Sequence, residues 1–357
     1  MRFLPDYRHM LDVLENRRPA RLPLYEHAVG TGIMEKVLGI QFADLEKGGD
    51  SDLRKFFTLY CRFFEVMTYD TVSFEVGICP LLPGHGAILG GRPGPIQNRA
   101  DFEKYPWAEL SERYWEAADR QFRVLAEVMP VGMKAVGGVG YGVFEISEDL
   151  VGFQQLPYMM VDDPELFADL YRKIGDLLVE IWSTFLKRFA SGYVVCRMGD
   201  DLGFKTATLV SPEIIRKHIL PQYRRVIGLV HKAGLPFLWH SCGNVFSIMD
   251  DVIALGIDAK HSNEDVIAPF DRWIICYRDQ IGLLGGIDVD LLCQTAPDEV
   301  YARVVEMGDR FRREANGYAL GSGNSIPDYV PVEGYLAMVK AVQYIRQHDG
   351  HSAPEHI

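Results

Sequence analysis

The stretch LPFLWHSCGN, residues 235–244, places a short apolar run directly before a histidine and a cysteine. Aromatic and aliphatic residues flanked by proline and glycine predict a β-strand over Pro236–Trp239. Residues i and i+2 of a strand point to the same side, so His240 and Cys242 are presented together. An imidazole nitrogen and a thiolate are half of the donor set of a zinc site. The stretch therefore predicts a strand and a metal-binding pair at its end.

Seven further runs of this kind alternate with helix-like stretches along the chain. Strand alternating with helix indicates parallel strands and right-handed crossovers, and eight such units close a (β/α)8 TIM barrel. An open, doubly wound sheet is the alternative. We predict an α/β barrel, a single domain over residues 1–357 with an N-terminal helical extension and a frayed tail over 348–357. The eight runs are Arg21–Tyr25, Thr71–Phe74, Met133–Val136, Tyr193–Arg197, Pro236–Trp239, Ile257–Lys260, Gly282–Leu284 and Gly317–Leu320.

The segments between the runs carry helix signals. Asp52–Met67 has apolar side chains at spacings of three and four residues, which predicts an amphipathic helix. Asp163, followed by proline and glutamate, predicts the start of a long helix that ends near Arg188. Ser211 opens another helix in the same way, and Pro221 within it predicts a kink or a division into two helices.

The bulk composition excludes some classes of function. The 357 residues carry a net charge of −12 without a basic stripe, which argues against nucleic acid as a main partner. The N-terminus lacks the apolar segment of a secretory signal, and no apolar run approaches the roughly 18 residues of a membrane span. Six scattered cysteines fit reduced thiols. We therefore expect a cytoplasmic protein that does not interact with membranes.

In a barrel, chemistry collects where the strands end. Most of the predicted strand ends carry an acidic, histidine or cysteine side chain, whereas the beginnings of the helices carry few comparable clusters. This asymmetry predicts an enzyme. Each feature also has a structural interpretation, such as a packed histidine, an inert thiol, a solvated acid or an aspartate that caps a loop. The residues after successive runs include Glu26 and His27, Glu75, Asp200 and Asp201, His240 and Cys242, Glu264, Asp288, and Ser322 and Asn324.

Taken together, these segments resemble the uroporphyrinogen decarboxylase superfamily along nearly the whole chain and in the same order. That superfamily is a (β/α)8 barrel, in agreement with the strand count. It contains cofactor-free decarboxylases and zinc-dependent methyltransferases that work with corrinoid proteins. The resemblance is carried by Gly199–Gly203, Ser211–Glu213, Pro221–Tyr223, His231–Gly234, His240–Asn244 and Gly321–Pro327 ahead of Pro331–Glu333.

Several residues favour the methyltransferase branch. The decarboxylase carries arginines after its first strand that bind substrate carboxylates, whereas this chain has Glu26, His27 and no arginine there. His-x-Cys is the metal motif of the methyltransferase branch, which implies His240, Cys242 and Glu264 as zinc ligands. That branch has a further cysteine in the loop after the eighth strand, where this chain has Ser322. Because serine is a poor zinc ligand, Cys79, His261, water or substrate could take that position.

The resemblance implies a zinc-dependent methyltransferase that moves a methyl group between a methylated or methoxylated small molecule, or a thiol acceptor, and a corrinoid protein. Asp200, Asp201, Glu26 and His27 are the expected catalytic residues. The expected substrate-binding residues are Glu75, Asn244, Ser322 and Asn324. A carboxy-lyase of the uroporphyrinogen decarboxylase type and a non-catalytic binding protein on a degenerate barrel are the alternatives.

Overall fold

The computed structural model describes residues 3–348 of the chain, and within that range its strands follow one another in order. In the seven-stranded sheet the order is β1-β2-β3-β4-β5-β6-β7. The pairs β2–β3, β3–β4 and β6–β7 are parallel, as the alternation of strand and helix predicts. The strands are β1 (Thr71–Gly77), β2 (Lys134–Gly140), β3 (Tyr193–Gly199), β4 (Phe237–His240), β5 (Ala259–His261), β6 (Gly282–Ile287) and β7 (Tyr318–Ser322).

The first predicted run, Arg21–Tyr25, forms a single bridge in place of a strand. Leu24 bridges Leu320 in parallel, with Leu320 N donating to Pro23 O at 3.0 Å and Tyr25 N donating to Leu320 O at 2.9 Å. Pro23 has no amide hydrogen, so the ladder ends there. The first run lies beside the last strand, and consecutive strands are neighbours. This is the order of a (β/α)8 barrel, so the predicted fold class is confirmed and the doubly wound alternative is excluded.

Helices fill the connections between the strands. Among residues 3–348, no helix combines the length and the apolar composition that crossing a membrane requires. The α-helices are α1 (Arg8–Leu14), α2 (Thr31–Leu38), α3 (Asp50–Val66), α4 (Arg99–Lys104), α5 (Leu110–Val128), α6 (Val143–Val151), α7 (Leu156–Asp162), α8 (Pro164–Phe189), α9 (Pro212–Ile214), α10 (Leu220–Lys232), α11 (Met249–Ala254), α12 (Phe270–Tyr277), α13 (Val289–Gln294), α14 (Pro297–Glu314) and α15 (Val332–Gln347). Shorter turns are η1 (Ala43–Lys47), η2 (Cys79–Leu81), η3 (Ala87–Leu89), η4 (Trp107–Glu109), η5 (Ala190–Gly192), the π-helix η6 (Ile215–Ile219) and η7 (Phe246–Ile248).

The chain folds into two compact units, each assembled from separate segments. Unit 1 comprises Met1–Ser73, Pro130–Lys134 and His261–Ile357, and unit 2 comprises Phe74–Met129 and Ala135–Lys260. The predicted N-terminal helical extension is present as α1, α2 and α3 in unit 1. A single domain over residues 1–357 stays a prediction. Of the predicted frayed tail, 348–357, only His348 lies within the described residues.

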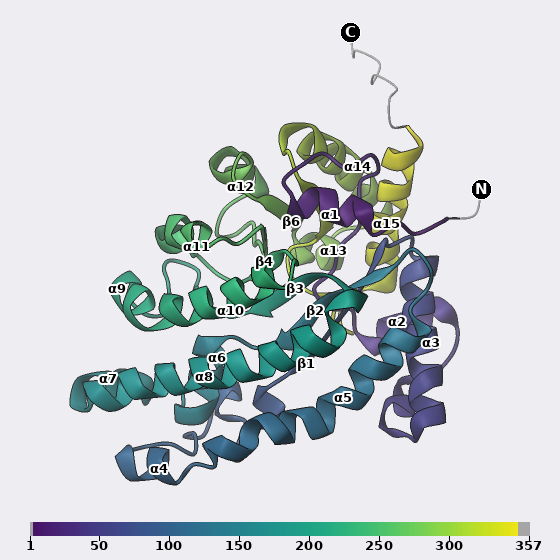
Figure 1. Ribbon diagram of the computed structural model, residues 1–357. Coiled ribbons are helices and arrows are strands. Elements are labelled where there is room, and N and C mark those ends of the chain that lie inside the picture. Colours follow the sequence, from purple (N-terminus) through teal and green to yellow (C-terminus); the bar gives the residue numbers. More distant parts are fainter. Residues whose placement is uncertain (1–2, 349–357) are drawn as a thin grey trace. The chain divides into compact units, whose positions relative to one another are not determined.

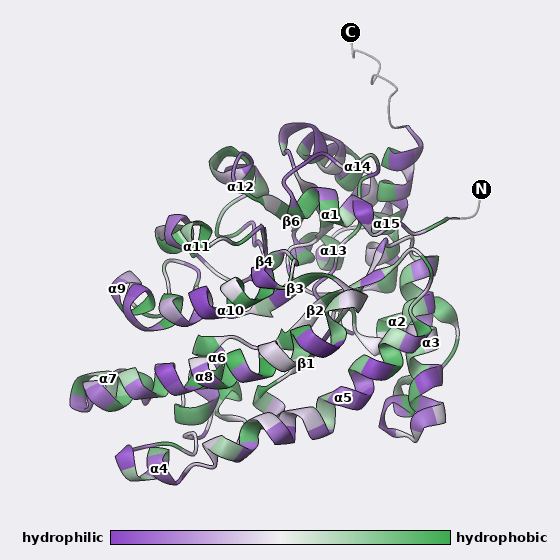
Figure 2. Cartoon of the chain, viewed as in Figure 1, coloured by the Kyte–Doolittle hydropathy of each residue, from purple (hydrophilic) through white to green (hydrophobic). Residues whose placement is uncertain are grey.

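In unit 2 the long helix α8 provides much of the core. It starts where the sequence predicts, because the Asp163 side chain accepts a hydrogen bond from Leu166 N at 2.8 Å. Figure 1 shows α8 running alongside α5 and α10, and Figure 2 shows hydrophobic and hydrophilic residues alternating along these helices. Trp182 and Phe185 of α8 are fully buried against β2. Both rings need a glycine at position 138, since a Cβ there would lie 3.1 Å from each of them.

The kink predicted at Pro221 is a change of helix type. α9 passes into the π-helix η6, and α10 begins at Leu220. Pro221 has no amide hydrogen to donate to the carbonyl four residues earlier, so the regular α-helical ladder is interrupted there. The interruption inserts a wider turn, and η6 and α10 both pack along α8.

In unit 1 a buried carboxylate ties the two ends of the described chain together. Asp70 is fully buried, accepts from Asp6 N at 2.9 Å and pairs with Arg21. The Arg346 guanidinium lies 3.9 Å from its other oxygen. Burial lowers the pKa of Arg346 to about 10, and the negative charge of Asp70 opposes that fall. The side chain of Asp70 therefore neutralises cations that burial would otherwise penalise.

We predict that Asp70→Ala lowers the free energy of unfolding by about 3 kcal/mol, because it leaves buried guanidinium charge without its counter-ion. Urea denaturation of the purified variant measures the loss. Asp279→Ala is the control, since the Asp279 side chain is 77% exposed beside Arg278 and should cost less than about 0.5 kcal/mol. Equal stability of the two variants would contradict a structural role for Asp70.

Candidate metal centre

Two loops of unit 2, residues 200–204 after β3 and 240–244 after β4, are joined by hydrogen bonds. Asp200 N donates to His240 O at 2.9 Å, and Gly203 N donates to Cys242 O at 3.1 Å. The Asn244 amide donates to Phe204 O at 2.7 Å. Side chains add two bonds, from Cys242 N to Asp201 Oδ1 at 2.8 Å and from Leu202 N to Ser241 Oγ at 3.1 Å. The backbone that carries His240 and Cys242 is thereby fixed by the neighbouring loop.

The two loops can approach this closely because each has a glycine at the contact. A Cβ on Gly243 would lie 2.1 Å from the carbonyl carbon of Gly203, and a Cβ on Gly203 would lie 2.6 Å from Cys242 O. Gly243 also has a φ of +81°, which side-chain-bearing residues rarely adopt. Both glycines are therefore required by the shape of the site.

Three potential ligand atoms converge beside this contact. Cys242 Sγ lies 3.5 Å from His240 Nε2, and Asp201 Oδ1 lies 4.0 Å from the same nitrogen. All three atoms lie within 4.8 Å of one another. His240 is buried, Cys242 is half-buried, and the Asp201 side chain is 41% exposed. Unit 2 thus presents one nitrogen, one sulphur and one oxygen donor toward a common point.

These positions fit a zinc ion. With Zn–N near 2.05 Å and Zn–S near 2.3 Å, a tetrahedral site places nitrogen and sulphur ~3.6 Å apart. The observed separation of His240 Nε2 and Cys242 Sγ is 3.5 Å. The donors also match the preference of zinc for imidazole and thiolate. The pair predicted from the sequence is therefore preorganised at the end of β4.

The two consecutive aspartates differ sharply in their surroundings. Asp200 is fully buried and accepts from Phe144 N at 2.9 Å, Glu145 N at 2.8 Å and Tyr223 OH at 2.6 Å. It holds the first turn of α6 and a residue of α10 at the end of β3. Burial raises the pKa of Asp200 to about 6, although these hydrogen bonds lower it. Its contacts are those of a residue that positions the loop, whereas Asp201 faces the donor cluster.

Two acids that the sequence reading did not select lie beside the aspartates. Burial, followed by the charges of Asp200 and Asp201, raises the pKa of Glu148 to about 8 and the pKa of Glu145 well above its usual range. Both belong to the first two turns of α6. The pattern of strand ends does not predict these two acids, because both lie inside a helix. Their place directly after the glycine-rich turn 137–142 was the available signal.

In unit 1 the expected catalytic residue Glu26 is a buried carboxyl bonded to Ser322. Ser322 N donates to Glu26 Oε1 at 2.9 Å, and the Ser322 hydroxyl donates to Oε2. Glu26 is only 1% exposed, and burial raises its pKa to about 8 against the opposing effect of the two hydrogen bonds. Glu26 is therefore largely protonated at neutral pH, and the Ser322 hydroxyl is already engaged with it.

Histidines of unit 1 gather next to this pair. His261 Nε2 lies 3.0 Å from Ser322 O, so it is held by the last residue of β7. The rings of His27 and His261 stack with centroids 6.1 Å apart, and Tyr25 contacts His261 edge-on at 4.9 Å. The expected catalytic His27 is thus placed against His261, one of the alternative ligands.

The third expected ligand, Glu264, also belongs to unit 1. It lines a pocket of about 310 Å³ at the ends of β5, β6 and β7, together with the expected substrate-binding residue Asn324. Asn263, Asp288 and Tyr329 contribute to the same walls. Ligation by Glu264 stays a prediction.

The other two expected substrate-binding residues make contacts within unit 2. Glu75 of β1 accepts two hydrogen bonds from Arg197 of β3, from Nε at 2.9 Å and from a terminal nitrogen at 2.7 Å. Arg197 is 1% exposed, so this is a largely buried ion pair. Asn244 Nδ2 donates to Thr206 O at 3.3 Å and Asn244 Oδ1 accepts from Phe246 N at 3.4 Å. These contacts hold both side chains in place, and their role toward a substrate stays a prediction.

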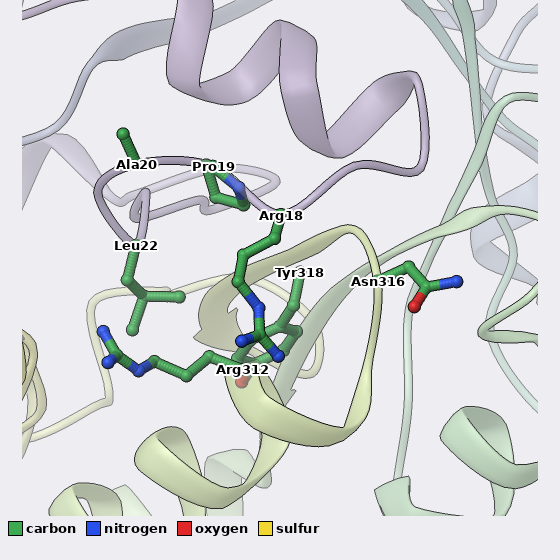
Figure 3. A pocket seen from close by; sticks show the side chains of 7 residues that line it. All are labelled: Arg18, Pro19, Ala20, Leu22, Arg312, Asn316 and Tyr318. Atoms are coloured by element: carbon green, nitrogen blue, oxygen red, sulfur yellow. The ribbon is translucent and has the colours of Figure 1, made fainter. Parts of the chain in front are cut away.

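Another pocket of unit 1 lies at the opposite end of β7. Figure 3 shows Arg18 reaching from its loop toward Arg312 and Tyr318. Tyr318 is the first residue of β7, so the pocket is near the beginnings of the strands. Arg18 donates to Arg313 O at 2.7 Å, which caps the last turn of α14. In a barrel this end serves stability, and the pocket is therefore a poor candidate for the reaction site.

Comparison with known families and structures agrees with the sequence motifs. The family model described as uroporphyrinogen decarboxylase (URO-D) matches residues 94–345, which is more than half of the chain. The chain belongs to the uroporphyrinogen decarboxylase family. Curated proteins gave no match.

Two solved structures share the fold of this family member. A methyltransferase from Methanosarcina mazei is 16% identical with a TM-score of 0.69, over 94% of this chain and 98% of that one. A B12-independent methionine synthase from Shewanella sp. W3-18-1, in complex with selenomethionine, is 11% identical with a TM-score of 0.50, over 84% and 89% of the two chains. At such identities the likeness extends to the fold alone.

We predict that Asp200→Ala lowers the free energy of unfolding by about 3 kcal/mol, because two buried amides and a buried hydroxyl lose their acceptor. The matched variant Asp201→Ala, at a half-exposed neighbour, should cost about 1 kcal/mol or less. Chemical denaturation followed by tryptophan fluorescence measures both. A larger loss in the Asp201 variant would show that the two roles are reversed.

A second prediction concerns pH. An acid whose pKa rises from 4.5 to about 8 on folding binds its proton more tightly when folded. Its contribution to stability is then present at low pH and is lost as pH rises through that window. The Glu26→Gln variant has no such contribution to lose. The difference in unfolding free energy, variant minus wild type, should therefore increase by on the order of 3 kcal/mol from pH 4.5 to pH 8.

Urea denaturation at several pH values gives this difference. Glu333→Gln, an exposed acid in the first turn of α15, is the control and should follow wild type throughout. A Glu26→Gln curve parallel to wild type would mean that Glu26 keeps an ordinary pKa.

Proposed function

We propose that this family member is a zinc-dependent methyltransferase. It would move a methyl group between a methoxylated or methylated small molecule, or a thiol acceptor, and a corrinoid supplied by a partner protein. The observation that carries the proposal is the 3.5 Å separation of His240 Nε2 and Cys242 Sγ at the end of β4. That spacing suits tetrahedral zinc, whereas the cofactor-free decarboxylase reaction requires no metal.

In this proposal His240, Cys242 and Glu264 hold the metal. Zinc, when bound, would act as a Lewis acid on the atom that carries or receives the methyl group. The donor set lacks a second thiolate at position 322. Fewer thiolate donors leave the metal more electrophilic, which favours a methoxylated substrate over a thiol.

The electron and proton balance defines what the other residues must do. For demethylation, the methyl–oxygen bond breaks with its electron pair remaining on the oxygen. A reduced corrinoid on the partner protein would provide the electron pair for the new bond to carbon. The released oxygen then requires a proton. Glu26 fits a proton donor because its carboxyl is largely protonated at neutral pH, with Ser322 as the adjoining hydroxyl.

The remaining expected residues would orient the reactants. We assign Asp201 and His27 to the reacting groups, with Asp200 holding the loop that carries Asp201. Glu75, Asn244, Ser322 and Asn324 would contact the substrate. The small-molecule substrate and the corrinoid protein are the proposed partners, and we place the reaction in the cytoplasm.

Two alternatives remain as outcomes of the test. A uroporphyrinogen decarboxylase would need cationic groups for a substrate rich in carboxylates, and the segment after the first run offers Glu26 and His27 instead. A non-catalytic binding protein would leave the metal ligands without a function, with Ser322 marking a lost site.

Metal analysis of the purified protein tests the proposal. We predict about one zinc per chain, and a loss of more than about tenfold in zinc affinity in Cys242→Ala, because thiolate is the strongest donor present. Cys276→Ala is the matched control, since this exposed cysteine lies in α12 of unit 1. The zinc-loaded protein should then demethylate a methoxylated phenol when a Co(I) corrinoid protein is added.

A metal-free protein that decarboxylates uroporphyrinogen would support the first alternative. A metal-free protein that catalyses neither reaction would support the second. Zinc retained equally in the Cys242 and Cys276 variants would remove Cys242 from the donor set.

A further inference from the structure

We propose that Asp201 is a protein ligand of the metal and supplies the negative charge that a second cysteine would otherwise provide. This inference rests on the proposed function, because it concerns the same metal. The combination to be explained is a histidine–cysteine pair, a serine at position 322 that is engaged elsewhere, and an aspartate beside the pair.

Ser322 is a poor replacement for a thiolate. Its hydroxyl donates to the buried Glu26 carboxyl, and its amide donates to the other oxygen of the same carboxyl. A hydroxyl that donates a hydrogen bond in this way keeps its proton. Because it is neutral, it adds no charge to a metal site. The negative charge that a second thiolate would bring must therefore come from another residue if the site is to keep it.

Asp201 lies close to the histidine–cysteine pair. Its Oδ1 lies 4.0 Å from His240 Nε2 and accepts from Cys242 N at 2.8 Å. In tetrahedral zinc sites a carboxylate oxygen and an imidazole nitrogen lie ~3.4 Å apart, so this separation must shorten by about 0.6 Å. The side chain is 41% exposed and can make that movement. The bond from Cys242 N keeps the carboxylate aimed at the pair.

Asp201 differs from its neighbour Asp200 in being available to a metal. Asp200 is fully buried and already accepts from Phe144 N, Glu145 N and Tyr223 OH. Turning it toward the metal would leave these three donors without an acceptor, at a cost of about 1–3 kcal/mol each. Asp201 has no comparable commitment to the core. The sequence Asp-Asp therefore divides into one residue that holds the loop and one that is available as a ligand.

The charges of the ligands in unit 2 also favour Asp201. A neutral imidazole, one thiolate and one carboxylate sum to two negative charges, so His240, Cys242 and Asp201 of unit 2 balance Zn²⁺ with or without a further charge from Glu264. Carboxylate oxygen is a harder and less electron-donating ligand than thiolate sulphur. Asp201 thus preserves the charge of the site while changing its donor type from sulphur to oxygen.

Cobalt(II) substitution tests this inference without relying on activity. Thiolate–Co(II) charge-transfer absorption scales with the number of cysteine ligands, so wild type should show the intensity of one. We expect Asp201→Cys to keep stoichiometric cobalt and to increase this intensity about twofold. Asp201→Asn should lower Co(II) and Zn²⁺ affinity at least tenfold in chelator competition.

Asp251→Asn is the matched control, because Asp251 is a similarly exposed aspartate of unit 2 that pairs with Arg216 at 2.9 Å. It should bind metal within twofold of wild type. Glu264→Gln, measured in parallel, tests the ligand predicted from the sequence. A loss in Glu264→Gln together with an unchanged Asp201→Asn would overturn the assignment of Asp201.

The outcomes separate this inference from the proposed function. Unchanged affinity in Asp201→Asn and unchanged absorption in Asp201→Cys would overturn ligation by Asp201. If Cys242→Ala still loses the metal in that case, the zinc enzyme stands with a different third ligand. A wild-type protein that binds neither cobalt nor zinc would instead defeat the proposed function itself, and ligation by Asp201 with it.

Discussion

The close contact of two backbones, at Gly203 and Gly243, is the constraint on which the candidate metal centre depends. With no Cβ on either residue, the loops after β3 and β4 approach until their amides and carbonyls form hydrogen bonds directly. This ladder fixes the direction of the chain as it leaves β4, and so it fixes where His240 and Cys242 project. The positions of the two candidate ligands are therefore set by contacts between backbones, which are more rigid than contacts between side chains.

Burial raises the pKa values of carboxyl groups in both units. In unit 2 the Asp200 carboxylate receives three donors, which offset part of the cost of removing it from water. In unit 1 Glu26 receives donors from a single residue, and burial dominates, so its pKa reaches about 8. Burial therefore leaves Asp200, which has three donors, with a pKa of about 6, and Glu26, which has donors from one residue, with a pKa of about 8. The number of donors around each carboxyl decides between these results.

Membership of a decarboxylase family leaves the chemistry of this chain open, because one barrel scaffold supports many reactions. The groups that differ lie at the strand ends and in the loops that follow. A site with nitrogen, sulphur and oxygen donors is suited to a metal, whereas the recognition of several substrate carboxylates would require cations. That contrast in charge and donor type is the physical basis for preferring methyl transfer.

Much of the architecture follows from the sequence itself. Seven of the eight apolar runs are strands, the long helix after Asp163 starts as its capping residue dictates, and Pro221 marks a real interruption. These features depend on local properties, namely side-chain alternation, capping and the missing amide hydrogen of proline. Such properties can be predicted from the sequence. The pairing of His240 with Cys242 can be predicted for the same reason, because residues i and i+2 of a strand point to the same side.

Other properties were decided only by the tertiary structure. The first run became a bridge because its neighbour across the sheet offered two hydrogen bonds before Pro23 ended the ladder. The different environments of Asp200 and Asp201, the hydrogen bonds from Ser322 to Glu26, and the acids Glu145 and Glu148 all depend on segments far apart in sequence. The burial of a residue and its hydrogen-bond partners depend on which segments are in contact in the folded chain. The sequence gives the side chains of each segment and not these contacts.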